Sequence, residues 1–231
     1  MLLSTALEDS INGEISDVIS DLAEIGLDSL FDEGVLREIP FISTAVSVYR
    51  IGRSISERHY IKKLLVFLKS VNEKIVDEDK RRLYMQRISN DPNKRSKELE
   101  YVLIIIDRYV GYDKPTMLAK LYLAFLEGNL SWREFALYAE ITDRFIIGDY
   151  DMLMSDSELF STTYSDYNES IFRLVALGLV AETSYPSAFE DLKKGFGVSI
   201  ESLEKIREGE VQYKRTRLGE RFVSIMNERY N

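Results

Sequence analysis

The residue types available for chemistry in this 231-residue chain are carboxylates, hydroxyls and lysines. The chain has no cysteine and a single histidine, His59. This inventory excludes disulfides, thiolate nucleophiles, iron–sulfur clusters and metal sites built from several histidines. The sequence also has no phosphate-binding glycine loop, no dinucleotide-binding glycine turn and no serine nucleophile elbow. It therefore predicts a protein without enzymatic activity and without a cofactor or metal.

The acidic groups that come closest to an acid–base or metal site have ordinary structural explanations. Residues 77–79 and the pair Asp149 and Asp151 fall in predicted turns, where acids commonly begin helices. Asp107 falls in a mostly apolar stretch, where a buried carboxylate needs a partner. Because Arg108 follows directly, we interpret the two as a structural ion pair.

Charge is distributed unevenly along the chain, which has a formal net charge of -9. Residues 1–48 carry ten acids and one base, whereas residues 50–100 carry 14 bases and eight acids. Either an acidic first helix packs beside the basic segment, or a basic face meets an anionic partner such as a lipid surface or a nucleic acid. The candidate contacts with an anionic surface are Arg50, Arg53, Arg58, Lys62, Lys63 and Lys69.

Helical periodicity predicts the elements that position these residues. Over residues 1–150 the pattern indicates a helical bundle. Its parts are an acidic helix 1–34, an apolar segment 39–51, a basic amphipathic helix 54–75, a buried helix 98–110, and helices 115–127 and 131–147. Capping-box spacing marks two of the helix starts, Ser54 with Glu57 and Ser131 with Glu134. In the helix that follows Ser54, the apolar stripe predicts that the lysines face solvent.

The longest run of low charge, residues 39–49, has eleven residues. A helix needs roughly 20 residues to span a bilayer, so this run does not cross a membrane by itself. It is either a buried core helix or a segment that enters a membrane interface. The sequence shows no signal peptide, which predicts a cytoplasmic location, with peripheral contact at the inner membrane face as the alternative.

Residues 151–231 follow a different pattern, namely a helix over 168–177, an extended segment, a long insert 184–210, a second extended segment 211–216 and a final helix 218–230. This order resembles that of winged helix-turn-helix modules. The resemblance is carried by Leu174-Val-Ala-Leu-Gly-Leu-Val180, which resembles a recognition helix entering its wing, and by Tyr213-Lys-Arg-Thr-Arg-Leu-Gly219, which resembles the returning strand. The predicted fold class is therefore mostly α, with an N-terminal helical bundle followed by a winged-helix-like α+β module.

A winged-helix module brings DNA into consideration. The candidate nucleic-acid contacts are Arg173, Lys193, Lys194, Lys214, Arg215 and Arg217. The region is nevertheless net acidic, and the first turn of its recognition helix offers few cations, whereas phosphate contacts need lysine and arginine. Nucleic acid is therefore a disfavoured partner.

The middle of the chain resembles uncharacterised helical bacterial proteins that are grouped with phage-defence or abortive-infection genes. The residues that carry this resemblance are Pro40 to Thr44, Arg53 to Leu68 and Lys120 to Phe135. The resemblance implies an accessory or effector protein that acts through protein contacts, either with another protein or with copies of itself, at a membrane surface in one version of the hypothesis. The alternative is a winged-helix DNA-binding transcriptional regulator.

Overall fold

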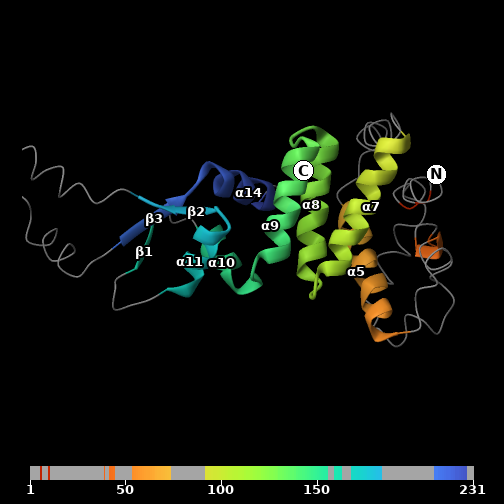
Figure 1. Ribbon diagram of the computed structural model, residues 1–231, viewed down its shortest axis with the longest axis horizontal. Helices are drawn as coiled ribbons and strands as arrows, with labels where there is room; N and C mark the ends of the chain where they lie inside the picture. Colours follow the sequence, from red (N-terminus) through yellow and green to blue (C-terminus); the bar gives the residue numbers. More distant parts are fainter. Residues whose placement is uncertain are drawn as a thin grey trace, which may run out of the picture. The chain divides into compact units, whose positions relative to one another are not determined.

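The computed structural model of the chain describes residues 54–73, 92–155, 159–162, 168–183 and 211–227, together with Ala6, Ser10, Ile39 and residues 42–44. Most of the predicted acidic helix 1–34 and apolar segment 39–51, and all of the insert 184–210, lie outside these residues. The described part is mostly helical, as the sequence predicts, and has one small antiparallel sheet (Figure 1). It divides between Asp143 and Arg144 into two compact units, which we call the N-terminal and C-terminal units.

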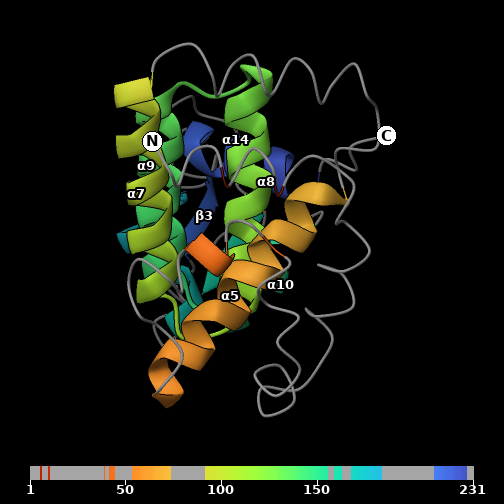
Figure 2. The same ribbon diagram turned by 90° about the vertical axis from the view of Figure 1, so that its right-hand side faces the viewer.

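Four long helices are described in the N-terminal unit: α5 (Ile55–Asn72), α7 (Pro92–Arg108), α8 (Asp113–Glu127) and α9 (Trp132–Arg144). The last three run nearly side by side, and α5 crosses them obliquely (Figure 2). The main partner of α5 is α8, and α5 also contacts α7. This packing buries the apolar stripe of α5 that the sequence predicts, including Leu64, Leu65 and Leu68.

Local capping signals in the sequence are confirmed at both predicted helix starts. The Ser54 side chain accepts from the Glu57 backbone N–H, and the Glu57 carboxylate accepts from the Ser54 N–H at 2.9 Å. Ser131 and Glu134 make the same reciprocal pair at the start of α9. The helix α8 ends at Gly128, whose φ of 88° is the left-handed conformation that glycine adopts without a steric penalty.

The helix α7 differs from its predicted bounds, 98–110. It begins at Pro92, six residues before the predicted start, and ends at Arg108. Proline fits the first turn of a helix because the N–H groups of that turn have no intrahelical acceptor, so no hydrogen bond is lost when proline lacks one. The helix is also less enclosed than predicted, since Ile104 is 53% exposed.

Aromatic rings from all four helices form a connected cluster in the N-terminal unit. Its members are Phe67, Tyr101, Tyr122, Phe125, Trp132 and Phe135. Ring centroids in this cluster lie 5.1 Å apart for Trp132 and Phe135 and 5.9 Å apart for Tyr122 and Phe135. Such contacts add to the hydrophobic contribution of burial and fix the arrangement of α7, α8 and α9.

The C-terminal unit contains short elements. In chain order they are η2 (Ile147–Asp149), α10 (Tyr150–Met154), β1 (Leu159–Thr162), α11 (Glu169–Ala176), β2 (Val180–Glu182), β3 (Val211–Arg215) and α14 (Arg217–Asn227). Asn168 caps α11, and Gly178, with φ 73°, turns the chain into β2. These bounds agree closely with the helix, extended segments and final helix expected from the sequence.

The sheet of the C-terminal unit is antiparallel and has the order β1-β3-β2. The register places Phe160 and Glu182 on either side of Tyr213, the central residue of β3. Neither β1 nor α10 is predicted from the sequence. The strand β1 forms because β3 offers an edge to pair with, and this long-range partner is not visible in four residues of sequence.

Candidate functional site

The six cations predicted to contact an anionic surface do not form one solvent-facing stripe on α5. Arg50 and Arg53 lie outside the described residues. Lys62 and Lys63 are only 8% and 5% exposed, so the prediction that the lysines of this helix face solvent is wrong for both. Arg58 is half-buried, and Lys69 pairs with Glu73.

Lys63 has a structural role that explains its burial. Its Nζ donates to the backbone carbonyls of Asp107 at 2.7 Å and Tyr109 at 2.6 Å, where α7 ends. The last carbonyls of a helix have no intrahelical partner, and a lysine ammonium satisfies them. Burial lowers the pKa of Lys63, and the nearby carboxylate of Asp107 opposes that shift.

Replacing Lys63 with methionine is expected to lower the free energy of unfolding of the N-terminal unit by about 1–3 kcal/mol, because two carbonyls lose their donor. Urea unfolding followed by the fluorescence of Trp132, the single tryptophan, measures this effect. The matched control is Lys69→Met, which removes an ion pair near the surface and should cost less than about 1 kcal/mol. Equal losses in the two variants would contradict the capping role.

A second polar network joins α7, α8 and α9 at the same end of the unit as Lys63. Arg108 binds both Glu140, at 3.2 Å, and the carboxylate of Asp143. Lys114 donates to the Asp143 carbonyl at 2.6 Å and so caps α9 as Lys63 caps α7. The predicted pair of Asp107 with Arg108 is therefore wrong, because Arg108 turns toward α9 and Asp107 is exposed.

Tyrosines beside this network keep their protons to unusually high pH. Burial, followed by the Glu140 carboxylate, raises the pKa of Tyr101 to about 12, and burial also raises the pKa of Tyr109. An unfolded tyrosine ionises near pH 10. Between about pH 10 and about pH 12 the unfolded chain therefore releases protons that the folded chain retains, and stability falls as pH rises.

The measurement is the free energy of unfolding at about pH 9 and about pH 11 for the wild type and for Tyr101→Phe. The variant should lose less stability over this interval, although its stability at neutral pH is lower because its bonds to Ala136 and Glu140 are absent. Lysines also titrate in this interval, but they are the same in both proteins, so their contribution cancels when the two losses of stability are compared. A steeper alkaline loss in the variant would contradict the prediction.

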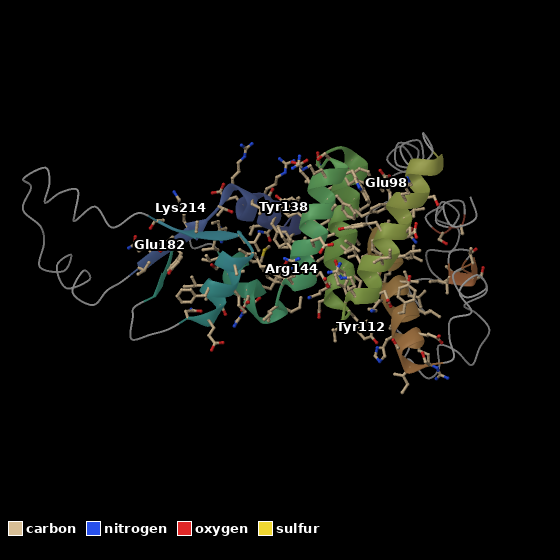
Figure 3. The ribbon with its side chains drawn as sticks, viewed as in Figure 1. Glu98, Tyr112, Tyr138, Arg144, Glu182 and Lys214 are labelled. Atoms are coloured by element: carbon tan, nitrogen blue, oxygen red, sulfur yellow. The ribbon has the colours of Figure 1, made fainter. Side chains whose placement is uncertain are left out.

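The single histidine has a defined neighbour. The Tyr112 hydroxyl lies 2.5 Å from His59 Nδ1, and the two rings stack with centroids 5.8 Å apart. This contact joins the second turn of α5 to the connection between α7 and α8, where Figure 3 labels Tyr112. Burial raises the pKa of Tyr112, which disfavours the phenolate that a tyrosine nucleophile requires. The pair therefore has the features of a packing contact.

In the C-terminal unit, Arg173 belongs to an internal ion pair. Its guanidinium binds Asp149 through Nε at 2.8 Å and Nη2 at 2.6 Å, and Nη1 lies 3.2 Å from Glu169. The Asp149 side chain is 2% exposed, and the bonds from Arg173 lower its pKa. Asp149 is a residue whose role the sequence does not reveal, because an acid in a turn is an ordinary helix start.

Arg215 is also engaged inside the unit. Its Nε donates to the Leu153 carbonyl at 2.9 Å, and Nη2 bonds the Ser155 carbonyl, which ties β3 to the end of α10. Lys214 and Arg217 are exposed, and Lys193 and Lys194 lie outside the described residues. Of the six predicted nucleic-acid contacts, the structure therefore places two in internal contacts and two at the surface.

The outer face of α11 is apolar and acidic. Its exposed residues are Glu169, Phe172 and Ala176, which helical spacing places on one side. The only cation of α11 is Arg173, which is engaged by Asp149 and Glu169. This surface, defined by Glu169, Phe172 and Ala176 and called the Phe172 face below, is a site that sequence reasoning missed, although an aromatic residue at an outward helical position was a visible signal.

Within the described residues, no three histidine, aspartate or glutamate side chains gather in a way that would hold a metal ion. Among the described helices, none has both the length and the apolar character needed to cross a membrane. Comparison with protein-family models, with curated proteins and with solved structures finds no match for the chain.

Proposed function

We propose that this protein is a non-enzymatic accessory or effector protein whose C-terminal unit is a winged-helix module adapted to bind a protein. The single observation that carries the proposal is the composition of the Phe172 face. A helix that reads DNA presents cations and hydrogen-bonding side chains to the groove, whereas α11 presents Phe172, Ala176 and Glu169. Exposed aromatic residues are typical of protein interfaces.

The order of elements supports the winged-helix part of the proposal. The described elements follow the order α10, β1, α11, β2, β3 and α14, with the sheet order β1-β3-β2, and this order resembles that of a winged helix.

The setting that we propose is bacterial phage defence or a related conflict system, on the resemblance of the middle of the chain to proteins of that kind. The membrane-surface version of the hypothesis is weaker, because Lys62 and Lys63 are buried and Lys69 pairs with Glu73. We therefore assign the interaction to protein contacts.

A photo-crosslinking amino acid at position 172 tests the proposal in cells of the native host. Irradiation is expected to join the chain to another protein, and a crosslinker at position 214 is the control because Lys214 is exposed elsewhere in the same unit. In parallel, Phe172→Ser should reduce protection in a phage plaque assay. Crosslinks to nucleic acid, or equal protein crosslinking from both positions, would contradict the proposal.

The alternative function, a DNA-binding regulator, is favoured by the exposed cations Lys214 and Arg217 on β3 and α14. A fluorescence-anisotropy titration with mixed-sequence duplex DNA distinguishes the two. A regulator must bind with an affinity that falls steeply as salt is added, since phosphate contacts release counterions. We expect no saturable binding, and a salt-dependent complex that Arg217→Gln weakens would establish the alternative.

A further inference from the structure

The Phe172 face combines an exposed ring with a rigid support. The Phe172 side chain is 38% exposed, and its ring meets that of Tyr213 on β3 edge to face, with centroids 6.2 Å apart. Tyr213 is 5% exposed, so the Phe172 ring packs against a buried side chain on its inner side. A ring fixed in this way loses little conformational entropy when a partner covers it.

The charges around this ring are mainly negative. The Glu169 side chain is 74% exposed. Glu182 is exposed and stands directly opposite Tyr213 in the β2–β3 register, which puts it on the same face of the sheet as the residue that supports Phe172. Arg173 adds one positive charge between the two carboxylates of Asp149 and Glu169. Arg215, two residues after Tyr213 in β3, is on the same face of the sheet, but it is half-buried and bonds the Leu153 and Ser155 carbonyls. Among the described residues the three carboxylates therefore outnumber the two guanidinium groups.

Lys214, the exposed cation next to Tyr213 in sequence, points to the other side of the sheet. Lys214 follows Tyr213 in β3, and successive strand residues point to opposite faces. Figure 3 labels Lys214 and Glu182 on these neighbouring strands. Lys214 is thus separated from the acids beside Phe172.

We infer that the Phe172 face binds an amphipathic, cationic segment of a partner protein, with an apolar side chain against Phe172 and lysine or arginine residues against Glu169 and Glu182. This inference rests on the proposed function and specifies the partner of the same surface. A nucleic-acid phosphate or an anionic lipid would meet two carboxylates here. The surface is small, which fits a weak and transient complex whose association rate depends on salt.

A direct test uses the full chain and a synthetic helical peptide of leucine, lysine and alanine with one apolar face. Two probes of the same length accompany it, one with the lysines replaced by glutamates and one with the sequence scrambled. Fluorescence anisotropy at low salt should show binding of the cationic amphipathic peptide, weaker binding of the scrambled peptide and no binding of the acidic peptide. Added salt should weaken the complex.

Variants locate the binding on the Phe172 face. Phe172→Ser should weaken the complex about tenfold, and Glu182→Gln should weaken it roughly threefold. Asp113→Asn removes one exposed acid from the N-terminal unit and should leave affinity unchanged, as should Lys214→Gln. Circular dichroism of each variant shows whether it is folded, and Glu182→Gln keeps the test valid if Phe172→Ser is not.

Three results would overturn the inference: equal binding of the acidic peptide, equal loss of affinity in Asp113→Asn and Glu182→Gln, or a dimer in light scattering that Phe172→Ser dissociates. The dimer would assign the face to a second copy of the chain. The crosslinking experiment separates this failure from failure of the proposed function. A crosslink from position 172 to an acidic or neutral protein surface would remove the partner class and leave the protein-binding function in place.

Discussion

Gly219→Ala is expected to prevent correct folding of the C-terminal unit, with a loss of stability of at least about 3 kcal/mol. A Cβ at Gly219 would lie 2.0 Å from the Leu179 carbonyl oxygen and 2.9 Å from its carbon. Both are backbone atoms held in place, since the Leu179 oxygen accepts from the Thr216 N–H at 3.0 Å and the Thr216 hydroxyl donates to the Gly178 carbonyl at 2.7 Å. No side chain can move aside to relieve the overlap.

Gly148→Ala provides the matched control, because a Cβ at that position has nothing within 4 Å and its φ is not positive. It should change stability by less than about 0.5 kcal/mol. Urea unfolding followed by circular dichroism measures both variants, and Trp132 fluorescence records the N-terminal unit in the same samples. If the two alanine variants unfolded at the same urea concentration, the close approach of α14 to Leu179 would be wrong.

Elements that are specified by neighbouring residues were predictable from the sequence. The two capping boxes begin at Ser54 and Ser131, as their spacing predicts, and Gly128 ends α8. In each case the donor and the acceptor lie within a few residues of each other. The start of α7 is the exception, because Asn-Asp-Pro before a charged stretch also fits a turn, and the local sequence does not decide between the two.

The roles of charged residues were not predictable, because their partners are distant in sequence. Lys63 caps α7 through carbonyls that lie 44 and 46 residues away. A helical-wheel argument sees the lysine beside an apolar stripe and assigns it to solvent. Arg173 likewise reads as a candidate phosphate contact, whereas its partner Asp149 lies 24 residues earlier. The sequence thus indicates where the cations lie on each element, but it does not indicate which of them bond to partners inside the protein.

The Phe172 face also combines a feature that the local sequence predicts with features that depend on distant residues. Ile171 and Leu174 are buried on the inner side of α11, and helical spacing places Phe172 on the outer side. Its support by Tyr213 and its acidic surroundings depend on the pairing of β2 with β3, across an insert of nearly thirty residues. The residue was identifiable from sequence, whereas its function as a surface was not.

The pair of Asp149 and Arg173 gives the second large effect. Arg173→Met is expected to lower the melting temperature of the C-terminal unit by roughly 5–10 °C, because it leaves the carboxylate of Asp149, 2% exposed, without its charged partner. Asp149→Asn should cost less, since an amide carries no uncompensated charge. Adding Asp149→Asn to Arg173→Met should restore part of the loss.

The pH dependence of stability distinguishes this ion pair from simple packing. In the wild type, Arg173 holds the pKa of Asp149 below its usual value, so the contribution of the pair is fully present above about pH 4 and is lost as pH falls below that value. In Arg173→Met the buried carboxylate has no cation, and burial then raises its pKa above the unfolded value. The variant should therefore gain stability, relative to the wild type, as pH falls from about 7 to about 4. Melting curves across that interval for the wild type, Arg173→Met and Arg173→Met/Asp149→Asn give the comparison. The double variant should lose the gain, because it lacks the titrating group, and parallel curves for all three proteins would show that Asp149 and Arg173 act only by packing.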